Sequence, residues 1–339
     1  MQRELTSGDL LDERGRLREV GWARQEIRRY RRAAIRAPWF RIKEWDYYCV
    51  LNEEYGLALT VADNAYMGFL SASWLDFAKP EAVTDSITIP FPRGRMKMPE
   101  SADVGDIVQL HPKISLAFRH EAGGRRLTVD CPGFARGRGM TGEIFLAQPQ
   151  MDRMAIATPF PDAPRAFYYN QKINCMPAEG AVEIDGRRHV FGPSSAFGLL
   201  DWGRGVWTYD NTWYWGSASG LVNGRSFGFN IGYGFGDTSA ATENMVFVEG
   251  VAHKLGEVAF HIPSGTYDGA PWTFSSSDGR FEMTFEPIVD RSAAVDLKIL
   301  RSIQHQVFGR FSGFAILDDG GRIEVKDFLG FAEEVENRW

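Results

Sequence analysis

Residues 226–234 alternate between large apolar and very small side chains. Successive side chains of a β-strand point to opposite faces, so this segment predicts a strand with two unlike faces. The large side chains on one face are Phe227, Phe229, Ile231 and Tyr233. The other face holds glycines and Asn230, so a neighbouring group must fill the volume beside it. That group is either a ligand or a closely packed backbone, and Asn230 slightly favours the ligand because a buried amide needs hydrogen-bond partners.

The surrounding segment, residues 199–249, is rich in aromatic residues and glycines. Its run LLDWGRGVWTYDNTWYWGSASG contains four of the ten tryptophans, which are Trp202, Trp207, Trp213 and Trp215. One core layer does not need this many rings, and the glycines leave space beside them. Because each ring buries a large apolar area, the segment predicts an aromatic-walled cavity for an apolar or amphipathic small molecule.

From residue 42 onward, short β-branched or aromatic segments alternate with turn residues, as in SITIPF and ISLAFRHE. Hairpin turns are predicted at Gly123-Gly124, Asp185-Gly186 and Asp319-Gly320-Gly321. The proline-rich stretch 151–167 separates two strand-rich regions. We therefore expect a mostly β protein with a first domain over 37–155 and a second over 156–339. Both would be antiparallel barrels or sandwiches with protected edges, and the second would contain the aromatic site.

Residues 1–36 predict an N-terminal arm that ends in a basic helix. Its apolar anchors are Trp22, Ile27, Tyr30 and Ile35, and its arginines are Arg24, Arg28, Arg29, Arg31, Arg32 and Arg36. Pro38 would end the helix, because the residue before a proline is disfavoured in the α region. We interpret the arginines as a solvated helix face rather than a site for phosphate or anionic lipid.

Charge and composition exclude several classes of function. A net charge of −6 argues against nucleic acid as a partner. The three cysteines are widely spaced and form no metal-ligand pattern, which favours a reducing compartment. The charged N-terminus lacks the apolar core of a signal peptide, and no apolar run approaches a membrane span of roughly 20 residues, so we expect a cytoplasmic protein. No P-loop, GxSxG elbow or dinucleotide fingerprint occurs, so neither cofactor nor metal is expected. The oligomeric state stays open.

Asp201 is the first candidate for catalysis. It lies in the DWGRG segment, and it could serve as a general acid if burial raised its pKa. The alternative is a turn carboxylate that pairs with Arg204. Glu249 and His253 share strand parity, so both could project toward one cavity as further catalytic candidates.

The ligand-binding candidates are aromatic or polar residues of the same region and of the HQVFG segment. They are Arg204, Trp207, Trp213, Trp215, Asn230, Tyr233, His305 and Gln306. The histidines are too scattered to form a metal site, and each alone is typical of a structural role.

Seven segments resemble the bacterial family called domain of unknown function 2804. They are PWFRIKEWDYY (38–48), VADNAYMG (61–68), MPES (98–101), LDWGRGVW (200–207), TENMVFVEGVAHKL (242–255), QHQVFGRFSG (304–313) and the terminal GFAEEVENRW. Together they cover nearly the whole chain. The run from Leu200 to Trp215 is also similar, more distantly, to two-domain lipocalin-like proteins such as carotenoid 1,2-hydratase and tocopherol cyclase. That resemblance implies two calycin-type barrels, with an acidic residue that protonates an alkene or orients an apolar substrate. Asp201 is the nearest counterpart of that acid.

These observations lead to one hypothesis and two alternatives. The hypothesis is a β-barrel protein that binds a small molecule. The reactions that we consider for it are acid-assisted hydration, isomerisation and cyclisation. The first alternative is a carrier or sensor that uses the same cavity without chemistry. The second is a carbohydrate-active or carbohydrate-binding protein, in which Asp201 and Glu249 would form an acid/base pair about 5–10 Å apart across an open cleft.

Overall fold

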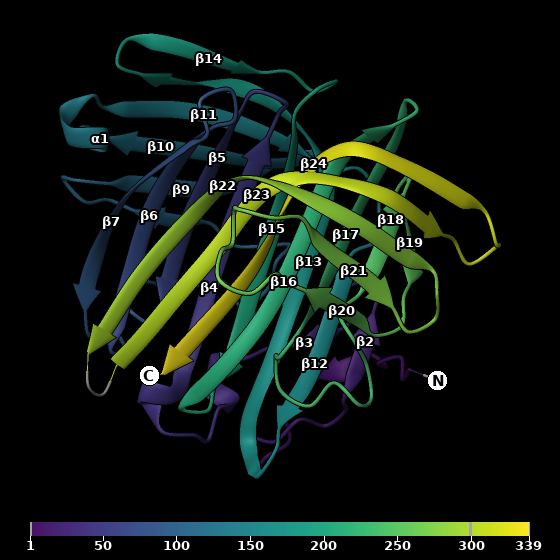
Figure 1. Ribbon diagram of the computed structural model, residues 1–339. Coiled ribbons are helices and arrows are strands. Elements are labelled where there is room, and N and C mark those ends of the chain that lie inside the picture. Colours follow the sequence, from purple (N-terminus) through teal and green to yellow (C-terminus); the bar gives the residue numbers. More distant parts are fainter. Residues whose placement is uncertain (1, 298–299, 339) are drawn as a thin grey trace.

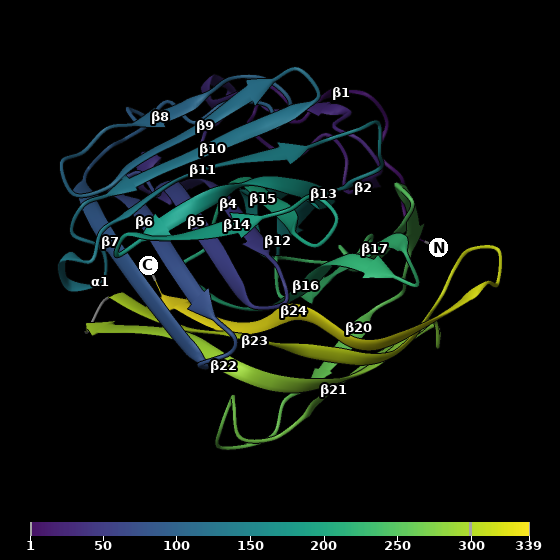
Figure 2. The same ribbon diagram turned by 90° about the horizontal axis from the view of Figure 1, so that it is seen from above.

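Strands dominate the computed structural model, which describes residues 2–297 and 300–338 (Figure 1). Within these residues the strands form a 13-stranded sheet, a 9-stranded sheet and a 2-stranded parallel ribbon. Both large sheets are antiparallel, and each curls into a half-barrel. In Figure 2 the first sheet (purple to teal) occupies the upper part of the picture, and the second (green to yellow) faces it in the lower part. The prediction of a mostly β protein with two antiparallel assemblies is confirmed.

The first sheet follows the order β7-β6-β5-β4-β15-β13-β11-β10-β9-β8, with β2, β12 and β14 attached through β12 and β13. Its strands are β2 (Gly21–Ala23), β4 (Ile42–Leu51), β5 (Tyr55–Asp63), β6 (Met67–Asp76), β7 (Glu81–Pro90), β8 (Ile107–Gln109), β9 (Ser115–Glu121), β10 (Gly124–Cys131), β11 (Met140–Ala147), β12 (Met154–Phe160), β13 (Ala163–Ile184), β14 (Arg187–Phe191) and β15 (Phe197–Val206).

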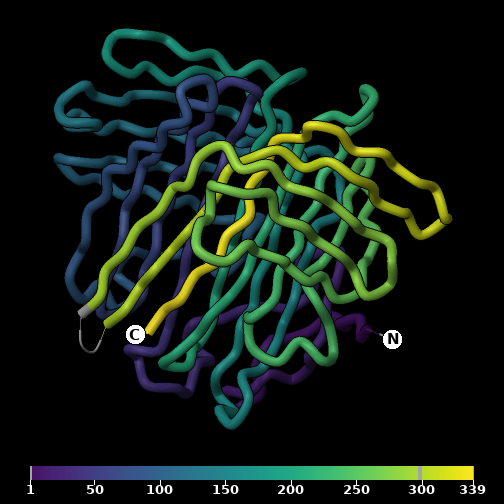
Figure 3. The backbone as a smooth tube through the Cα atoms, viewed as in Figure 1, coloured from purple at the N-terminus to yellow at the C-terminus, as the bar shows by residue number. Residues whose placement is uncertain are grey.

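The second sheet follows the order β19-β18-β17-β16-β24-β23-β22-β21-β20. Its strands are β16 (Asp210–Val222), β17 (Arg225–Tyr233), β18 (Met245–Val248), β19 (Val251–Lys254), β20 (Val258–His261), β21 (Trp272–Ser276), β22 (Phe281–Leu297), β23 (Leu300–Ile316) and β24 (Arg322–Arg338). The long strands β22, β23 and β24 run side by side across the molecule (Figure 3). The described part of the chain contains no helix long and apolar enough to cross a membrane.

The passage between the sheets differs from the predicted boundary at 155/156. The chain leaves the first sheet after Val206 and enters the second at Asp210. The proline-rich stretch that suggested the boundary instead forms β12 and the start of β13. The β12–β13 pairing shifts register beside Pro159, and such irregularities are where a sheet accommodates proline.

The predicted basic helix of the N-terminal arm is absent from the described residues, so that prediction is wrong. The arm forms β1 (Gly8–Asp9), β2, β3 (Arg28–Arg29) and the single 3-10 turn η1 (Arg32–Ala34). Its anchors bind the first sheet: β2, which holds Trp22, pairs with β12, and the buried Tyr30 hydroxyl donates to Glu44 Oε1 at 2.8 Å. Contacts with the sheet and ion pairs such as Arg28–Glu19 therefore outweigh local helix propensity.

The predicted hairpin turns are confirmed, because each lies between two paired strands and contains a glycine with positive φ. These glycines are Gly123, Gly186 and Gly320, with φ of +80°, +70° and +85°. A short helix, α1 (Phe134–Gly137), and the 3-10 turn η2 (Trp39–Arg41) complete the described elements.

The two faces of β17 separate as the alternation predicts. Phe227, Phe229 and Ile231 are buried in the core of the second half-barrel, and Tyr233 packs against it. The glycine face lies against β13: a Cβ atom at Gly228 would come within 2.5 Å of Cys175 Sγ. Side chains of neighbouring segments therefore fill this volume, because a Cβ atom at Gly232 would likewise collide with Glu243 Oε1.

Candidate functional site

Four charged side chains are buried together where the two sheets meet, and we call them the inter-sheet cluster. Lys172 (β13) and Asp201 (β15) come from the first sheet, Glu243 precedes β18 and Glu333 lies on β24. Their exposed fractions are between 1% and 7%. Lys172 Nζ lies 2.9 Å from Asp201 Oδ1. Buried charges are expensive unless they are paired, so such a cluster is unusual in an ordinary core.

Strand register and alternation create the cluster. Lys172 and Asp201 are direct partners in the β13–β15 ladder, so they share a face. Gly203 follows on that face, and its missing side chain makes room for the indole of Trp45. This is the predicted use of glycine beside an aromatic ring, although the ring comes from β4 and not from the aromatic segment itself.

The Asp201 carboxylate accepts three hydrogen bonds. Its donors are Lys172 Nζ, Asn170 Nδ2 at 2.6 Å and Trp45 Nε1 at 3.0 Å. A carboxylate bound by an ammonium and two further donors is suited to holding a fixed negative charge. The predicted alternative, a pair with Arg204, is not formed.

Arg204 points to the opposite face of β15. It is fully buried, its Nη2 donates to Asp46 Oδ1 at 2.9 Å, and its guanidinium lies 4.1 Å from the ring centroid of Trp202. Its other donors bind backbone carbonyls, among them that of Pro99. The structure therefore places Arg204 in the interior of the first half-barrel, away from the inter-sheet cluster.

The two glutamates differ from Asp201. The pKa of Glu243 and of Glu333 is raised from 4.5 to about 7. Burial is the largest cause, the negative charge of Asp201 adds to the increase, and the positive charge of Lys172 opposes it. A carboxyl group whose pKa lies near neutrality can both hold and release a proton there. Both glutamates therefore have a property that a general acid needs.

The hydrogen bonds of the two glutamates are unequal. Glu333 accepts from Trp213 Nε1 at 3.1 Å and from Gln306 Nε2 at 3.0 Å, one bond for each oxygen. Glu243 Oε2 accepts from the Tyr168 hydroxyl at 3.3 Å. The other oxygen of Glu243 is buried and has no hydrogen-bond partner among the described residues. Several other buried polar atoms share this state, and Glu243 Oε1 is the one that belongs to a charged group of the cluster.

Aromatic rings line the cluster. Lys172 Nζ lies 3.7 Å from the ring centroid of Trp215, whose Nε1 donates to Asn230 Oδ1 at 2.7 Å. Tyr47 donates to Gln306 Oε1 at 3.1 Å. The structure thus brings together five of the sequence-predicted site residues, which are Asp201, Trp213, Trp215, Asn230 and Gln306.

Other predicted site residues lie elsewhere. Glu249 is exposed in the turn between β18 and β19, and its φ is +50°. Because it lies outside both strands, the alternation of side chains along a strand does not place it on the same face as His253. His253 lies on β19 beside Asp318, at 3.5 Å. The acid/base pair considered for a carbohydrate enzyme is not assembled, because Asp201 is buried between the sheets and Glu249 faces solvent. Tyr233 and His305 lie on the opposite face of the second sheet.

Sequence reasoning did not identify Lys172, Glu243, Glu333 or Tyr168 as site residues. A signal for Lys172 was present: in the YNQKIN segment, Asn170, Lys172 and Asn174 occupy alternate positions of one predicted strand. A strand with polar residues on one buried face requires partners on the element that covers it.

A cavity of about 570 Å³ lies beside the cluster, and we call it the Trp207 cavity. Its lining combines apolar side chains with arginines: Arg14, Arg16, Ala37, Pro38, Arg41, Ala163, Pro164, Arg165, Ala166, Val206, Trp207, Thr208 and Tyr209. Trp207 connects it to the cluster. The ring centroid of Trp207 lies 5.3 Å from that of Trp213, which donates a hydrogen bond to Glu333. It lies 5.9 Å from that of Tyr168, which donates a hydrogen bond to Glu243.

We expect Gly203→Ala to lower the free energy of unfolding by about 1–3 kcal/mol. The added Cβ would lie 2.0 Å from the Trp45 ring and would displace the indole that donates to Asp201. Gly133→Ala is the matched control, because a Cβ there meets no atom within 4 Å and φ is −89°. Urea unfolding should show a change within about 0.5 kcal/mol for the control. Equal effects of the two substitutions would contradict the tight fit at Gly203.

Comparisons with known proteins show the fold and the family. No curated protein matches the sequence. CghA is 12% identical over 98% of this chain and 97% of its own, with a TM-score of 0.53. A protein assigned as AttH from Nitrosomonas europaea is 16% identical over 87% and 92%, with a TM-score of 0.53. CghA in complex with Sch210972 is 12% identical over 88% of each chain, with a TM-score of 0.52. These likenesses show a fold of two antiparallel barrels.

Family membership follows from the sequence itself. The model of the family described as "Domain of unknown function (DUF2804)" matches residues 2–339, the segments that carried the resemblance included, and the chain belongs to this family.

Proposed function

We propose that this protein binds an amphipathic small molecule between the Trp207 cavity and the inter-sheet cluster and protonates it with Glu243. The reaction class is acid-assisted hydration, isomerisation or cyclisation. One observation supports this most strongly: Glu243 is buried among aromatic rings, its pKa is raised to about 7, and one of its carboxyl oxygens has no partner among the described residues. Such a group is a proton donor near neutral pH.

The environment of Glu243 suits an apolar reacting group. The rings of Tyr168, Trp45 and Trp215 lie around the cluster, and aromatic faces stabilise the cationic character that develops when an apolar substrate is protonated. Asp201 has a different role from the one predicted. Its fixed charge disfavours ionisation of Glu243, which helps to keep the acid protonated.

The Trp207 cavity indicates the class of ligand. Its apolar wall suits a hydrocarbon portion, and its four arginines (Arg14, Arg16, Arg41 and Arg165) suit an anionic group. The Trp207 ring lies between this cavity and the rings of Trp213 and Tyr168, which contact the cluster. The complex of CghA with Sch210972 supports the proposal, because it is a chain of the same fold with a bound small molecule.

The test begins with native mass spectrometry of the freshly purified protein and extraction of the retained compound. Incubated with the protein in D₂O, that compound is expected to gain deuterium, because each proposed reaction transfers a solvent-derived proton to carbon. Glu243→Gln should slow this incorporation by about 100-fold or more. Glu282→Gln, which neutralises an exposed carboxylate on β22, is the control and should leave it unchanged.

The outcomes separate the alternatives. A compound that binds but gains no deuterium with the wild-type protein would favour the carrier or sensor. Deuterium incorporation that survives in a folded Glu243→Gln variant would refute the role of Glu243. A retained sugar would favour the carbohydrate alternative.

A further inference from the structure

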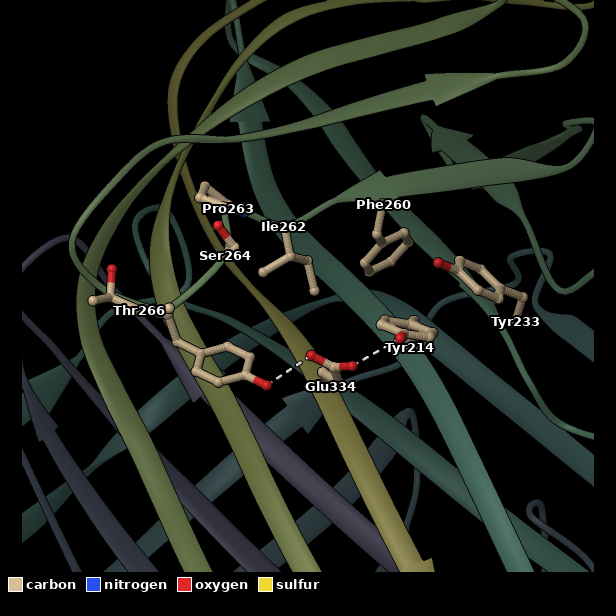
Figure 4. Close-up of a pocket in the computed structure, with 10 residues that line it drawn as sticks. Tyr214, Tyr233, Phe260, Ile262, Pro263, Ser264, Thr266 and Glu334 are labelled. Carbon is tan, nitrogen blue, oxygen red and sulfur yellow. Dashed lines mark hydrogen bonds between the residues drawn. The ribbon is translucent and has the colours of Figure 1, made fainter.

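A second cavity, of about 410 Å³, lies on the other face of the second sheet (Figure 4). Alternation along β24 separates the two sites: Glu333 points into the inter-sheet cluster, and the next residue, Glu334, points into this cavity. Glu334, Tyr214 and Tyr233 are direct partners across β24, β16 and β17, so they form one row. We call this site the Glu334 cavity.

Two tyrosines hold the carboxylate of Glu334. The Tyr214 hydroxyl donates to Oε1 and the Tyr267 hydroxyl donates to Oε2, each at 2.7 Å (Figure 4). The ring of Tyr267 stacks on His305, with centroids 3.7 Å apart, and His305 Nδ1 lies 2.7 Å from Asp290 Oδ2. His305, predicted as a ligand contact, therefore supports a wall of the cavity. These contacts preorganise the wall for ligand binding.

Aromatic faces form the rest of the cavity. Tyr214 and Tyr233 stack with centroids 4.6 Å apart, and Phe260 meets them edge-on at 6.0 and 5.5 Å. The loop 262–267, between β20 and β21, covers the site (Figure 4). The lining contains no lysine or arginine among the described residues. Rings with negative faces beside a carboxylate attract cations and repel anions.

We propose that the Glu334 cavity binds an organic cation of the alkylammonium class. Its aromatic faces would pack around the alkyl groups of the cation, and Glu334 would neutralise the charge. An ordinary metal ion would not use the ring faces, and an anion would oppose the carboxylate. The site is independent of the reaction proposed for Glu243, because the second sheet separates the two.

Calorimetric titration with choline tests this proposal. The comparison ligand is the uncharged carbon isostere of choline, in which a tert-butyl group replaces trimethylammonium. Choline should bind at least about tenfold more tightly than the isostere, and Glu334→Gln should weaken choline binding by about tenfold without affecting the isostere. Glu336→Gln is the matched control: Glu336 lies on the same strand face but pairs with Arg301 at 3.2 Å. It should change the affinity less than about twofold.

A second variant keeps the test valid if Glu334→Gln folds poorly. Tyr233→Leu preserves apolar volume but removes a ring face, and it should weaken choline binding by about threefold to tenfold. Choline that does not bind the folded wild-type protein, or binds no better than its isostere, would overturn the proposal. Equal losses of choline affinity in Glu334→Gln and Glu336→Gln would also overturn it.

Phosphatidylcholine vesicles identify the source of the cation. Vesicle binding that free choline competes away indicates a lipid head group, and binding of free choline alone indicates a soluble cation.

Discussion

Replacing Lys172 with methionine is expected to lower the free energy of unfolding by about 3–5 kcal/mol. Lys172 is 2% exposed, and its ammonium lies 2.9 Å from the buried carboxylate of Asp201. Methionine would fill similar space but would leave that carboxylate without its cation. It would also remove the positive charge of Lys172, which opposes the increase in the pKa of Glu243 and Glu333. Urea unfolding at neutral pH measures the effect.

Two further variants show whether the loss comes from the unpaired charge. Lys113→Met removes an exposed ammonium and should change the unfolding free energy by less than about 0.5 kcal/mol. Adding Asp201→Asn to Lys172→Met should recover part of the loss, with a coupling energy of at least about 1 kcal/mol, because the unpaired carboxylate is gone. A Lys172→Met variant as stable as Lys113→Met would contradict a stabilising role for the pair.

Local patterns were enough to predict much of the fold. The alternation at residues 226–234 identified a strand and its apolar face, and Asp185-Gly186 identified a hairpin, because these features depend on neighbouring residues alone. The N-terminal arm was predicted incorrectly for the opposite reason. Its conformation depends on β12 and Glu44, which are distant in sequence, and those contacts override the helical spacing of its arginines.

The candidate site was partly predictable. The aromatic segment contains Asp201, Trp213 and Trp215, which the structure places around the inter-sheet cluster. Lys172 and Glu333 were missed because alternation defines two faces of a strand without showing which face meets another sheet. The register that places Lys172 opposite Asp201 is a property of two strands together, and a single sequence does not encode it locally.

Replacing Glu333 with glutamine is expected to raise the free energy of unfolding at about pH 8, by up to about 3 kcal/mol. Burial raises the pKa of Glu333 from 4.5 to about 7 in the folded protein. As the pH rises through this interval, the unfolded chain releases a proton that the folded chain keeps. Stability therefore falls by up to about 1.4 kcal/mol per pH unit for this group. Below the unfolded pKa the group is protonated in both states, so the gain from glutamine disappears there.

Urea unfolding across this pH range would measure the difference between Glu333→Gln and the wild-type protein. Glu282→Gln, at an exposed position, is the control and should follow the wild-type curve. Parallel curves for Glu333→Gln and wild type would contradict the raised pKa. A gain in stability would show that the chain retains a destabilising acid in its interior. Selection for stability alone would remove such a group, so its retention would support a chemical role for the inter-sheet cluster.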